Sequence, residues 1–316
     1  VPAGFEDAAI VTSGSGNSLS TFTTPGVDAV TISGTDLAYK AGVFSGFKTI
    51  DATGLTGAFK SATASGGIAN INITGNADGT SIILGDGDNN LSFVSASSAT
   101  KSDAVLLGNG DNTLNAQKGA GSLSVLAGSG DDTVRLGGTT AMTDGDIVSL
   151  GGGDDTVIIN NAVANNLVFQ GVENLTLTKT ASGTNTIISA DSALAVTAQV
   201  DNNAVDIQGL TAGSTVTVDD ASNATAGVTD LTVNYASKEA STTIAVNAAA
   251  AGAATGLTVD NVTALTLDFA KAADFSTGDT NTDQTTSMTI TAAKALNTGD
   301  LLNGNKLTTL SVTGQD

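Results

Sequence analysis

Several residue types on which enzymes and metalloproteins commonly depend are missing from this chain. It contains no cysteine, no histidine and no tryptophan, only 2 prolines, and a single arginine, Arg135. Zinc sites built from cysteine and histidine, thiol nucleophiles, histidine general bases and serine–histidine triads are therefore excluded. No run of about 18 apolar residues occurs, which excludes a membrane-spanning helix. We do not expect the chain to be an enzyme.

Positive charge is also scarce. The 316 residues include 31 acidic and 11 basic side chains, which gives a formal net charge of −20. Nucleic acid is excluded as a partner, because binding to its phosphates requires clustered lysine and arginine. Among the acids, aspartate outnumbers glutamate by 28 to 3. Aromatic residues make up only 3 % of the chain, so we expect a core of Val, Ile, Leu and Ala.

Short blocks of alternating apolar and polar residues recur along the whole length. Gly, Asn, Asp and Ser bound each block, as is typical of strands separated by turns. Examples are Asp28–Ser33, Ala69–Thr74, Asp103–Leu107 and Asp155–Asn160. Helical periodicity is limited to two short segments, Asp36–Gly46 and Thr291–Leu302. The pattern predicts an all-β protein with few short helices.

One glycine- and aspartate-rich motif occurs four times in the middle of the chain. The copies are Leu84–Leu91, Leu107–Leu114, Ala127–Val134 and Leu150–Val157. Their second residues are Gly85, Gly108, Gly128 and Gly151, so the intervals are 23, 20 and 23 residues. Two short strands and two turns need about 20 residues, which is the length of one solenoid coil. The repeat therefore predicts an elongated parallel β-roll or β-helix-like solenoid with coils of about 20 residues.

A second repeat, an apolar–Thr–apolar triplet, follows from about residue 171. It places apolar side chains on one face of a strand and threonine on the other. Its copies, one with serine in place of threonine, begin at Leu175, Val216, Leu231, Leu257, Leu265, Met288 and Leu310. The two textures predict an N-terminal β segment over 1–74, a metal-binding β-roll over 75–160 and a Thr-rich solenoid over 161–316.

Stacking the four motif loops would bring their carboxylates close together. At about 5 Å and an effective dielectric constant near 20, each like-charged pair repels by about 3 kcal/mol. The only basic residues between 61 and 178 are Lys101, Lys118 and Arg135. Ca²⁺ would relieve this repulsion, because it takes 6 to 8 oxygens from carboxylates and carbonyls in flexible geometry, and glycine lets backbone carbonyls turn toward an ion.

The expected calcium ligands are all within the four motif copies. They are Gly85, Asp86, Gly87, Asp88, Asn89, Gly108, Asn109, Gly110, Asp111, Asn112, Gly128, Gly130, Asp131, Asp132, Gly151, Gly153, Asp154 and Asp155. Mg²⁺ is a weaker candidate because it requires a tight octahedral shell. Ordinary Asp-Gly and Asn-Gly turns are the alternative interpretation of a single copy. Two other acidic pairs, Asp144/Asp146 and Asp219/Asp220, are further candidates for ion binding, but solvated turns are the favoured interpretation of both.

These loops resemble the glycine-rich nonapeptide of the RTX (repeats-in-toxin) family, Gly-Gly-x-Gly-x-Asp followed by an apolar residue. The resemblance covers residues 75–160 and implies a parallel β-roll with Ca²⁺ between stacked turns. By position, the motif aspartate falls on Asn89, Asn112, Asp132 and Asp155, and the residue before it is Asp88, Asp111, Asp131 and Asp154. The first glycine of the nonapeptide is absent from all four copies, two motif aspartates are replaced by asparagine, and the period is longer than nine.

The same resemblance implies type I secretion from a Gram-negative bacterium and folding in extracellular calcium. Composition rich in Thr, Ala, Asn and Gly is similar to that of RTX-type surface-layer (S-layer) proteins. We therefore expect a structural subunit that assembles with itself into a lattice on the cell surface, where cell-surface polysaccharide is a further partner. The alternative is a segment of a calcium-stiffened RTX adhesin. A polysaccharide lyase or epimerase is disfavoured, because few residues could serve as bases or cationic stabilisers.

Overall fold

The computed structural model confirms the predicted fold class: the chain is an all-β parallel solenoid with coils of about 22 residues. It describes residues 6–22, 26–39, 43–61, 73–138, 140, 142–143, 145–160, 165–178, 185–221, 227–249, 256–274, 280–282, 284–297, 301–302 and 306–314. The chain divides into two compact units, the first made of 1–141 and 145–157 and the second of 142–144 and 158–316. The three segments expected from the motif textures remain a prediction.

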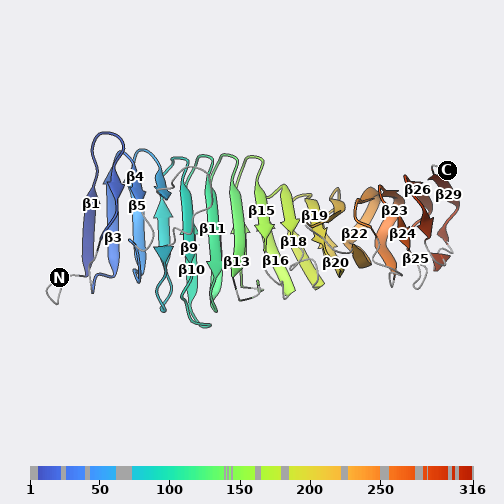
Figure 1. Cartoon of the computed structure of the whole chain (residues 1–316), viewed down its shortest axis with the longest axis horizontal. Helices are drawn as coiled ribbons and strands as arrows, with labels where there is room; N and C mark the ends of the chain where they lie inside the picture. The colour runs from blue at the N-terminus through green and yellow to red at the C-terminus, as the bar shows by residue number, and fades with distance from the viewer. Residues whose placement is uncertain are drawn as a thin grey trace. The chain divides into compact units, whose positions relative to one another are not determined.

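In the first unit, the strands form two parallel ladders that alternate along the chain (Figure 1). One ladder contains β1 (Asp7–Val11), β3 (Ala29–Gly34), β5 (Thr49–Leu55), β8 (Ser81–Leu84), β10 (Ser102–Leu106), β12 (Ser122–Leu126) and β14 (Ile147–Ser149). The other contains β2 (Ser18–Leu19), β4 (Leu37–Tyr39), β6 (Phe59–Ser61), β7 (Ile73–Thr74), β9 (Asn90–Val94), β11 (Thr113–Lys118), β13 (Thr133–Gly138) and β15 (Thr156–Ile159), whose last two residues belong to the second unit. Equivalent residues of successive coils therefore lie side by side, as Val105 does with Ile82 and Val125.

The core of this unit lies between the two ladders. Side chains alternate along the strands, so Leu114 and Ala116 of β11 are buried while Asn115 between them faces outward. Burying a leucine or isoleucine side chain contributes about 1.5–3 kcal/mol, and every coil repeats the contribution. Aromatic residues are few but gathered here, where Tyr39 stacks on Phe59 with ring centroids 4.7 Å apart and Phe44 lies 5.7 Å from Tyr39.

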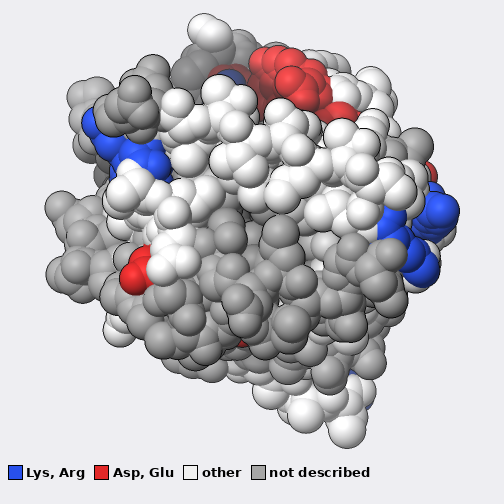
Figure 2. Space-filling model, turned by 90° about the vertical axis from the view of Figure 1, so that its right-hand side faces the viewer, with Lys and Arg blue, Asp and Glu red and all other residues white. Residues whose placement is uncertain are grey.

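The second unit repeats the same two-ladder plan. One ladder contains β16 (Asn165–Gln170), β18 (Asn185–Ala190), β20 (Asn203–Leu210), the first parts of β22 (Val228–Val246) and β23 (Leu257–Phe269), β25 (Thr280–Asn281) and β28 (Leu301–Leu302). The other contains β17 (Asn174–Leu177), β19 (Ala195–Val200), β21 (Thr215–Asp220), the later parts of β22 and β23, β26 (Ser287–Ala292) and β29 (Thr309–Gly314). Two short strands, β24 (Ala273–Asp274) and β27 (Leu296–Asn297), form a separate two-stranded sheet. Figure 2 shows acidic and basic side chains in small separate groups on the face it draws.

The apolar–Thr–apolar triplets form the strands expected of them. In β17 the leucines Leu175 and Leu177 are buried, and Thr176 between them lies beside Thr197 of the next coil. The period-2 pattern thus predicts the core side chains correctly in six of the seven triplets. In the last one, Leu310 and Val312 of β29 are 47 % and 63 % exposed, so this triplet forms a strand without buried apolar side chains.

The two predicted helices are wrong over the described residues. Asp36–Gly46 contains β4, and Thr291–Leu302 contains the end of β26 together with β27 and β28; residues 40–42 and 298–300 lie outside the description. Both segments are rich in alanine or leucine, which favour helices when isolated. Here pairing with neighbouring coils decides the conformation, because an unpaired segment between two parallel ladders would leave their backbone groups unsatisfied.

Candidate metal-binding edge

The four motif copies form the turns along one edge of the first unit. Each copy leaves a strand of one ladder and enters a strand of the other, so the four join β8 to β9, β10 to β11, β12 to β13 and β14 to β15. On either side of the loops the register is continuous, with Leu106 beside Leu126 and Thr113 beside Thr133. The four loops therefore lie above one another at the spacing of neighbouring strands, about 4.8 Å.

Two features of the stacked loops require glycine: a positive φ and the close approach of neighbouring backbones. Gly108 and Gly151 have φ of +77° and +91°, in the region that side-chain-bearing residues rarely adopt. A Cβ at Gly151 would lie 1.9 Å from the carbonyl oxygen of Gly128 in the neighbouring loop. The same carbonyl accepts the N–H of Gly152 at 3.0 Å. The loop backbones thus contact each other directly, and this carbonyl is already engaged between coils.

An inner row is formed by Asn89, Asn112, Asp132 and Asp155, all at most 2 % exposed. The side chain of Asp132 accepts the backbone N–H of Asn112 at 2.9 Å and its Nδ2–H at 2.8 Å. Asn112 accepts the same two bonds from Asn89, each at 3.0 Å, and Asp155 accepts the N–H of Asp132 at 2.8 Å. These four sequence-predicted ligands therefore form a buried hydrogen-bond ladder from coil to coil.

The third member of this row carries an unusual carboxyl group. The Oδ2 atom of Asp132 is buried and has no hydrogen-bond partner. Burial raises the pKa of Asp132, although hydrogen bonds from Asn112 act in the opposite direction. The neighbouring carboxylates of Asp111 and Asp131 raise the pKa further. A buried anion without full compensation is unfavourable, so this position favours either a protonated carboxyl or a cation.

An outer row is formed by the residues that immediately precede the inner row: Asp88, Asp111, Asp131 and Asp154, all exposed. Oδ1 of Asp88 accepts the N–H of Asp111 at 3.1 Å, and Oδ1 of Asp111 accepts the N–H of Asp131 at 3.0 Å. The pattern continues from Asp131 to Asp154 at 2.9 Å. Each bond fixes one carboxylate oxygen, so the carboxylates are held in a column at the strand spacing.

A third row lies near the start of the loops and loses its acidic character along the stack. Oδ1 of Asp86 accepts the backbone N–H of Asn109 at 3.2 Å and its Nδ2–H at 2.9 Å. Asn109 in turn accepts the N–H of Ser129 at 3.1 Å. Because the charge changes from aspartate to asparagine to serine, the outer row carries the strongest acidic column of this edge.

Two of the three nearby cations are paired with other carboxylates. At the surface, Nζ of Lys101 lies 3.9 Å from Oδ1 of Asp78. In the interior, Nζ of Lys118 lies 3.6 Å from Oδ2 of Asp146. Asp146 is 2 % exposed, so its interpretation as a solvated turn is wrong; Asp144 lies outside the described residues. Of the other pair, Asp220 forms an ion pair with Lys271.

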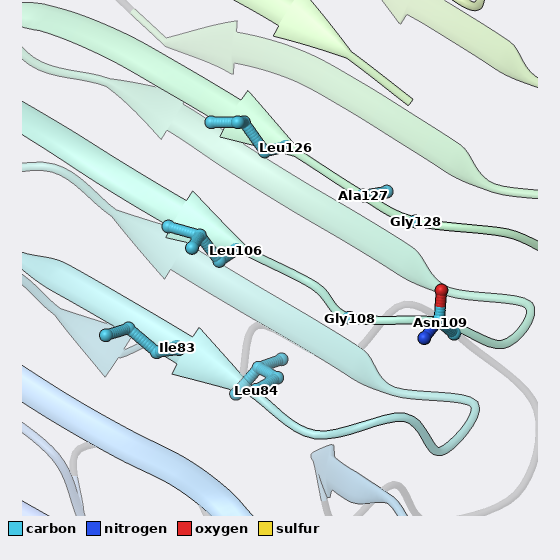
Figure 3. Close-up of a pocket in the computed structure, with 8 residues that line it drawn as sticks. All are labelled: Ile83, Leu84, Leu106, Gly108, Asn109, Leu126, Ala127 and Gly128. Carbon is cyan, nitrogen blue, oxygen red and sulfur yellow. The ribbon is translucent and has the colours of Figure 1, made fainter. Parts of the chain in front are cut away.

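An apolar stripe borders these loops and was not expected from the sequence analysis. Ile83, Leu106 and Leu126 lie side by side on the outer face of the ladder (Figure 3). Together with the loop residues Gly108 and Gly128 they line a hollow of about 300 Å³. The signal was present as a break in alternation: in Ile82-Ile83-Leu84 and Val105-Leu106-Leu107 an outward position is apolar as well.

The carboxylate side chains of this edge do not make a metal site by themselves. Among the described residues, no three Asp, Glu, His or Cys side chains form a group able to hold a metal ion, so backbone or amide oxygens would have to contribute.

Two further findings concern the chain in general. Over the residues that the structure describes, no helix is long and apolar enough to cross a membrane. Comparison with protein-family models, with curated proteins and with solved structures finds no match to this chain.

Proposed function

We propose that this chain is a calcium-binding structural subunit of a bacterial surface layer, related to RTX proteins, that assembles with itself outside a Gram-negative cell. The observation that carries the proposal is the outer row of stacked aspartates. Three of its carboxylates hold a backbone N–H of the next coil through Oδ1, which leaves Oδ2 available to a ligand.

The chemistry of the edge favours calcium. Carboxylates at the strand spacing of about 4.8 Å repel each other, and a divalent cation between two loops removes that repulsion. Ca²⁺ accepts a flexible shell of 6 to 8 oxygens, which suits carboxylates supplemented by loop carbonyls and water. Mg²⁺ requires a tighter octahedral shell and suits this open edge less well.

Calcium would couple folding to the extracellular compartment. With dissociation constants of about 10⁻⁴ M, typical of extracellular modules, each ion adds about 1.4 kcal/mol of stability at about 1 mM calcium. Three ions between four loops add about 4 kcal/mol, a large part of the stability of a typical domain. At the low calcium concentration of a cytosol this contribution disappears, which is compatible with type I secretion of a loosely folded chain.

The apolar stripe supports assembly of copies through this edge. Leu126 is 40 % exposed and Ile147 on the next strand is 41 % exposed. Apolar side chains lined up on an outer face are typical of protein contact surfaces. Because the stripe borders an acidic column, two such faces would repel each other until calcium neutralises them. Assembly is therefore expected to depend on calcium.

Negative-stain electron microscopy of the purified chain tests the proposal. Millimolar calcium is expected to produce two-dimensional sheets, and EGTA is expected to dissolve them. The double variant Asp111→Asn/Asp131→Asn should not form sheets and should bind fewer calcium ions in titration calorimetry. The matched control Asp219→Asn/Asp268→Asn removes the same charge from the second unit and should still assemble.

Rows of threonine on the second unit favour the adhesin alternative. Thr176, Thr197 and Thr217 form one outward row, and Thr243, Thr266 and Thr289 form another. Such hydroxyl rows suit hydrogen bonding to a cell-surface polysaccharide. If the chain binds calcium, stays monomeric and retains polysaccharide from whole cells, the adhesin replaces the surface layer. If it gives no calorimetric signal with calcium, both fail.

A further inference from the structure

A lysine and an aspartate meet inside the first unit at the edge opposite the motif loops. Lys118 is the last residue of β11, before the turn into β12, and Asp146 immediately precedes β14, at the end of the following turn on this edge. Both side chains are about 1 % exposed, and Nζ of Lys118 lies 3.6 Å from Oδ2 of Asp146. Lysine is rarely buried to this degree, because an ammonium ion and a carboxylate both lose their hydration.

The two oxygens of Asp146 have different surroundings. Oδ1 accepts the backbone N–H of Leu123 at 2.7 Å, while Oδ2 faces the lysine. The N–H bond polarises the carboxyl group so that Oδ1 has the character of a carbonyl oxygen and Oδ2 that of a hydroxyl. On the neighbouring coil, the residue beside Lys118 is Gly138, which adds no side chain to this space.

A preceding coil shows how this chain satisfies a buried carboxylate without a lysine. Asp103 is 1 % exposed, and its Oδ1 accepts the N–H of Thr80 at 2.8 Å. Its Oδ2 accepts hydroxyl groups from Ser95 and from Ser97, the latter at 2.8 Å. Each of the two carboxyl groups thus accepts a backbone N–H at Oδ1, but of the two only Asp146 faces an amine at Oδ2.

We propose that Lys118 and Asp146 condense into an intramolecular isopeptide bond once the chain has folded. The ammonium group first passes one proton to Oδ2, which gives a neutral amine and a neutral carboxylic acid. The lone pair of Nζ attacks Cγ, and a second proton moves from nitrogen to Oδ2. The bond between Cγ and Oδ2 then breaks and Oδ2 leaves as water. The product is an amide between Nζ and Cγ, with Oδ1 as its carbonyl oxygen.

Burial favours each step of this condensation. Transfer of a proton within the pair removes both charges from a low-dielectric interior. Well-oriented groups held together in a protein react with effective molarities of about 10⁵–10⁸ M. The amide is uncharged and keeps Oδ1 available for the N–H of Leu123. Since bulk water is excluded from the site, hydrolysis of the product is slow.

The bond would join two successive turns of this edge by a covalent cross-link. Lys118 precedes the turn into β12, and Asp146 ends the turn that leads into β14. These turns lie on the edge that has no motif loops, so the amide would hold this edge together whatever the calcium concentration. The proposal is therefore independent of the calcium edge.

Mass spectrometry of the intact, denatured chain tests the proposal directly. We expect a mass lower than that of the sequence by one water molecule. Trypsin should fail to cleave after Lys118 and should release a branched species that joins 102–135 to 136–179. Lys118→Arg keeps the positive charge but cannot form this amide, so its mass should equal that of its sequence.

Succinimide formation is the competing source of a lost water. The chain contains Asp-Gly at 78–79, 86–87 and 144–145, and each can lose water without any lysine. A succinimide leaves no branched peptide and persists in Lys118→Arg. The isopeptide is overturned if the wild-type chain has its full sequence mass, if 102–118 is recovered as a free peptide in full yield, or if the loss persists in that variant. The wild-type peptide map decides the question even if Lys118→Arg fails to fold.

Discussion

At the scale of single residues, each motif loop sends two neighbouring side chains to opposite sides. Asp131 is exposed and holds the N–H of Asp154, whereas Asp132 is buried and holds the N–H of Asn112. Two oxygen-rich residues in succession thus perform different tasks, one within the core and one at the surface. A substitution in either row is expected to report on its own task.

Two adjacent glycines of one loop, Gly151 and Gly152, provide a matched test of the stacked geometry. In Gly151→Ala the new Cβ would lie 1.9 Å from the carbonyl oxygen of Gly128, at a positive φ. We expect a loss of at least about 2 kcal/mol in the free energy of unfolding. Gly152→Ala meets no atom within 4 Å and should change stability by less than about 1 kcal/mol. Urea denaturation in EGTA measures both, and equal losses would contradict the stacked-loop geometry.

A pH dependence is expected from Asp230 of β22. Burial raises the pKa of this carboxyl, and the nearby charge of Asp206 raises it further, whereas a hydrogen bond from Leu231 lowers it. A raised pKa in the folded state means that the stabilising contribution is present below the unfolded pKa and is lost as pH rises through the folded pKa. Asp230→Asn should therefore match the wild type below about pH 3.8, where the carboxyl is protonated in both states, and be the more stable form at neutral pH.

Chemical denaturation across that pH range is the measurement. Asp206→Asn is the informative companion, because it removes one cause of the shift and leaves the carboxyl of Asp230 in place. This variant should show a smaller change in stability between low and neutral pH than the wild type, but the change should not disappear. A wild type that becomes more stable relative to Asp230→Asn as pH rises would reverse the assigned direction.

At the scale of the element, alternation along a strand separates core from surface. Leu114 of β11 is fully buried, while Leu126 of β12 is 40 % exposed on the outer stripe. We expect Leu114→Ala to cost about 2–5 kcal/mol in stability. Leu126→Ala should cost less than about 1 kcal/mol and instead reduce assembly in calcium. Thermal unfolding together with light scattering distinguishes the two effects, and a large stability loss at Leu126 would contradict its outward position.

The strand positions could be predicted from the sequence. The sequence could not show that the two expected helices are wrong. Leu175-Thr-Leu177 shows the alternation of a half-buried strand without reference to any neighbour. Thr291–Leu302 lacks such alternation and has residues with good helical propensity. The extended conformation of its described strand residues depends on partners such as Phe269, which pairs with Ala292. Short segments of this kind are decided by pairing rather than by local preference.

At the scale of the whole molecule, the proposed calcium edge belongs to the first unit alone. In a repeat protein each coil contacts its neighbours, so a bound ion stabilises the coils next to it most. Hydrogen exchange with calcium and then with EGTA should therefore change protection strongly over β9 to β13 and little over β22 to β23. Equal changes in both regions, or none in either, would contradict calcium binding at this edge.

The sequence alone determined the coil length, the parallel solenoid and, for most strands, the side that faces the core. These properties follow from periods of 2 and of about 20 residues, which are read along the chain. Only the tertiary structure decided that Asn89 and Asp132 lie inside, that Ile83, Leu106 and Leu126 form a stripe, and that Lys118 meets Asp146. Stacking brings together residues that are 20 or more positions apart, and no local pattern specifies which atoms then touch.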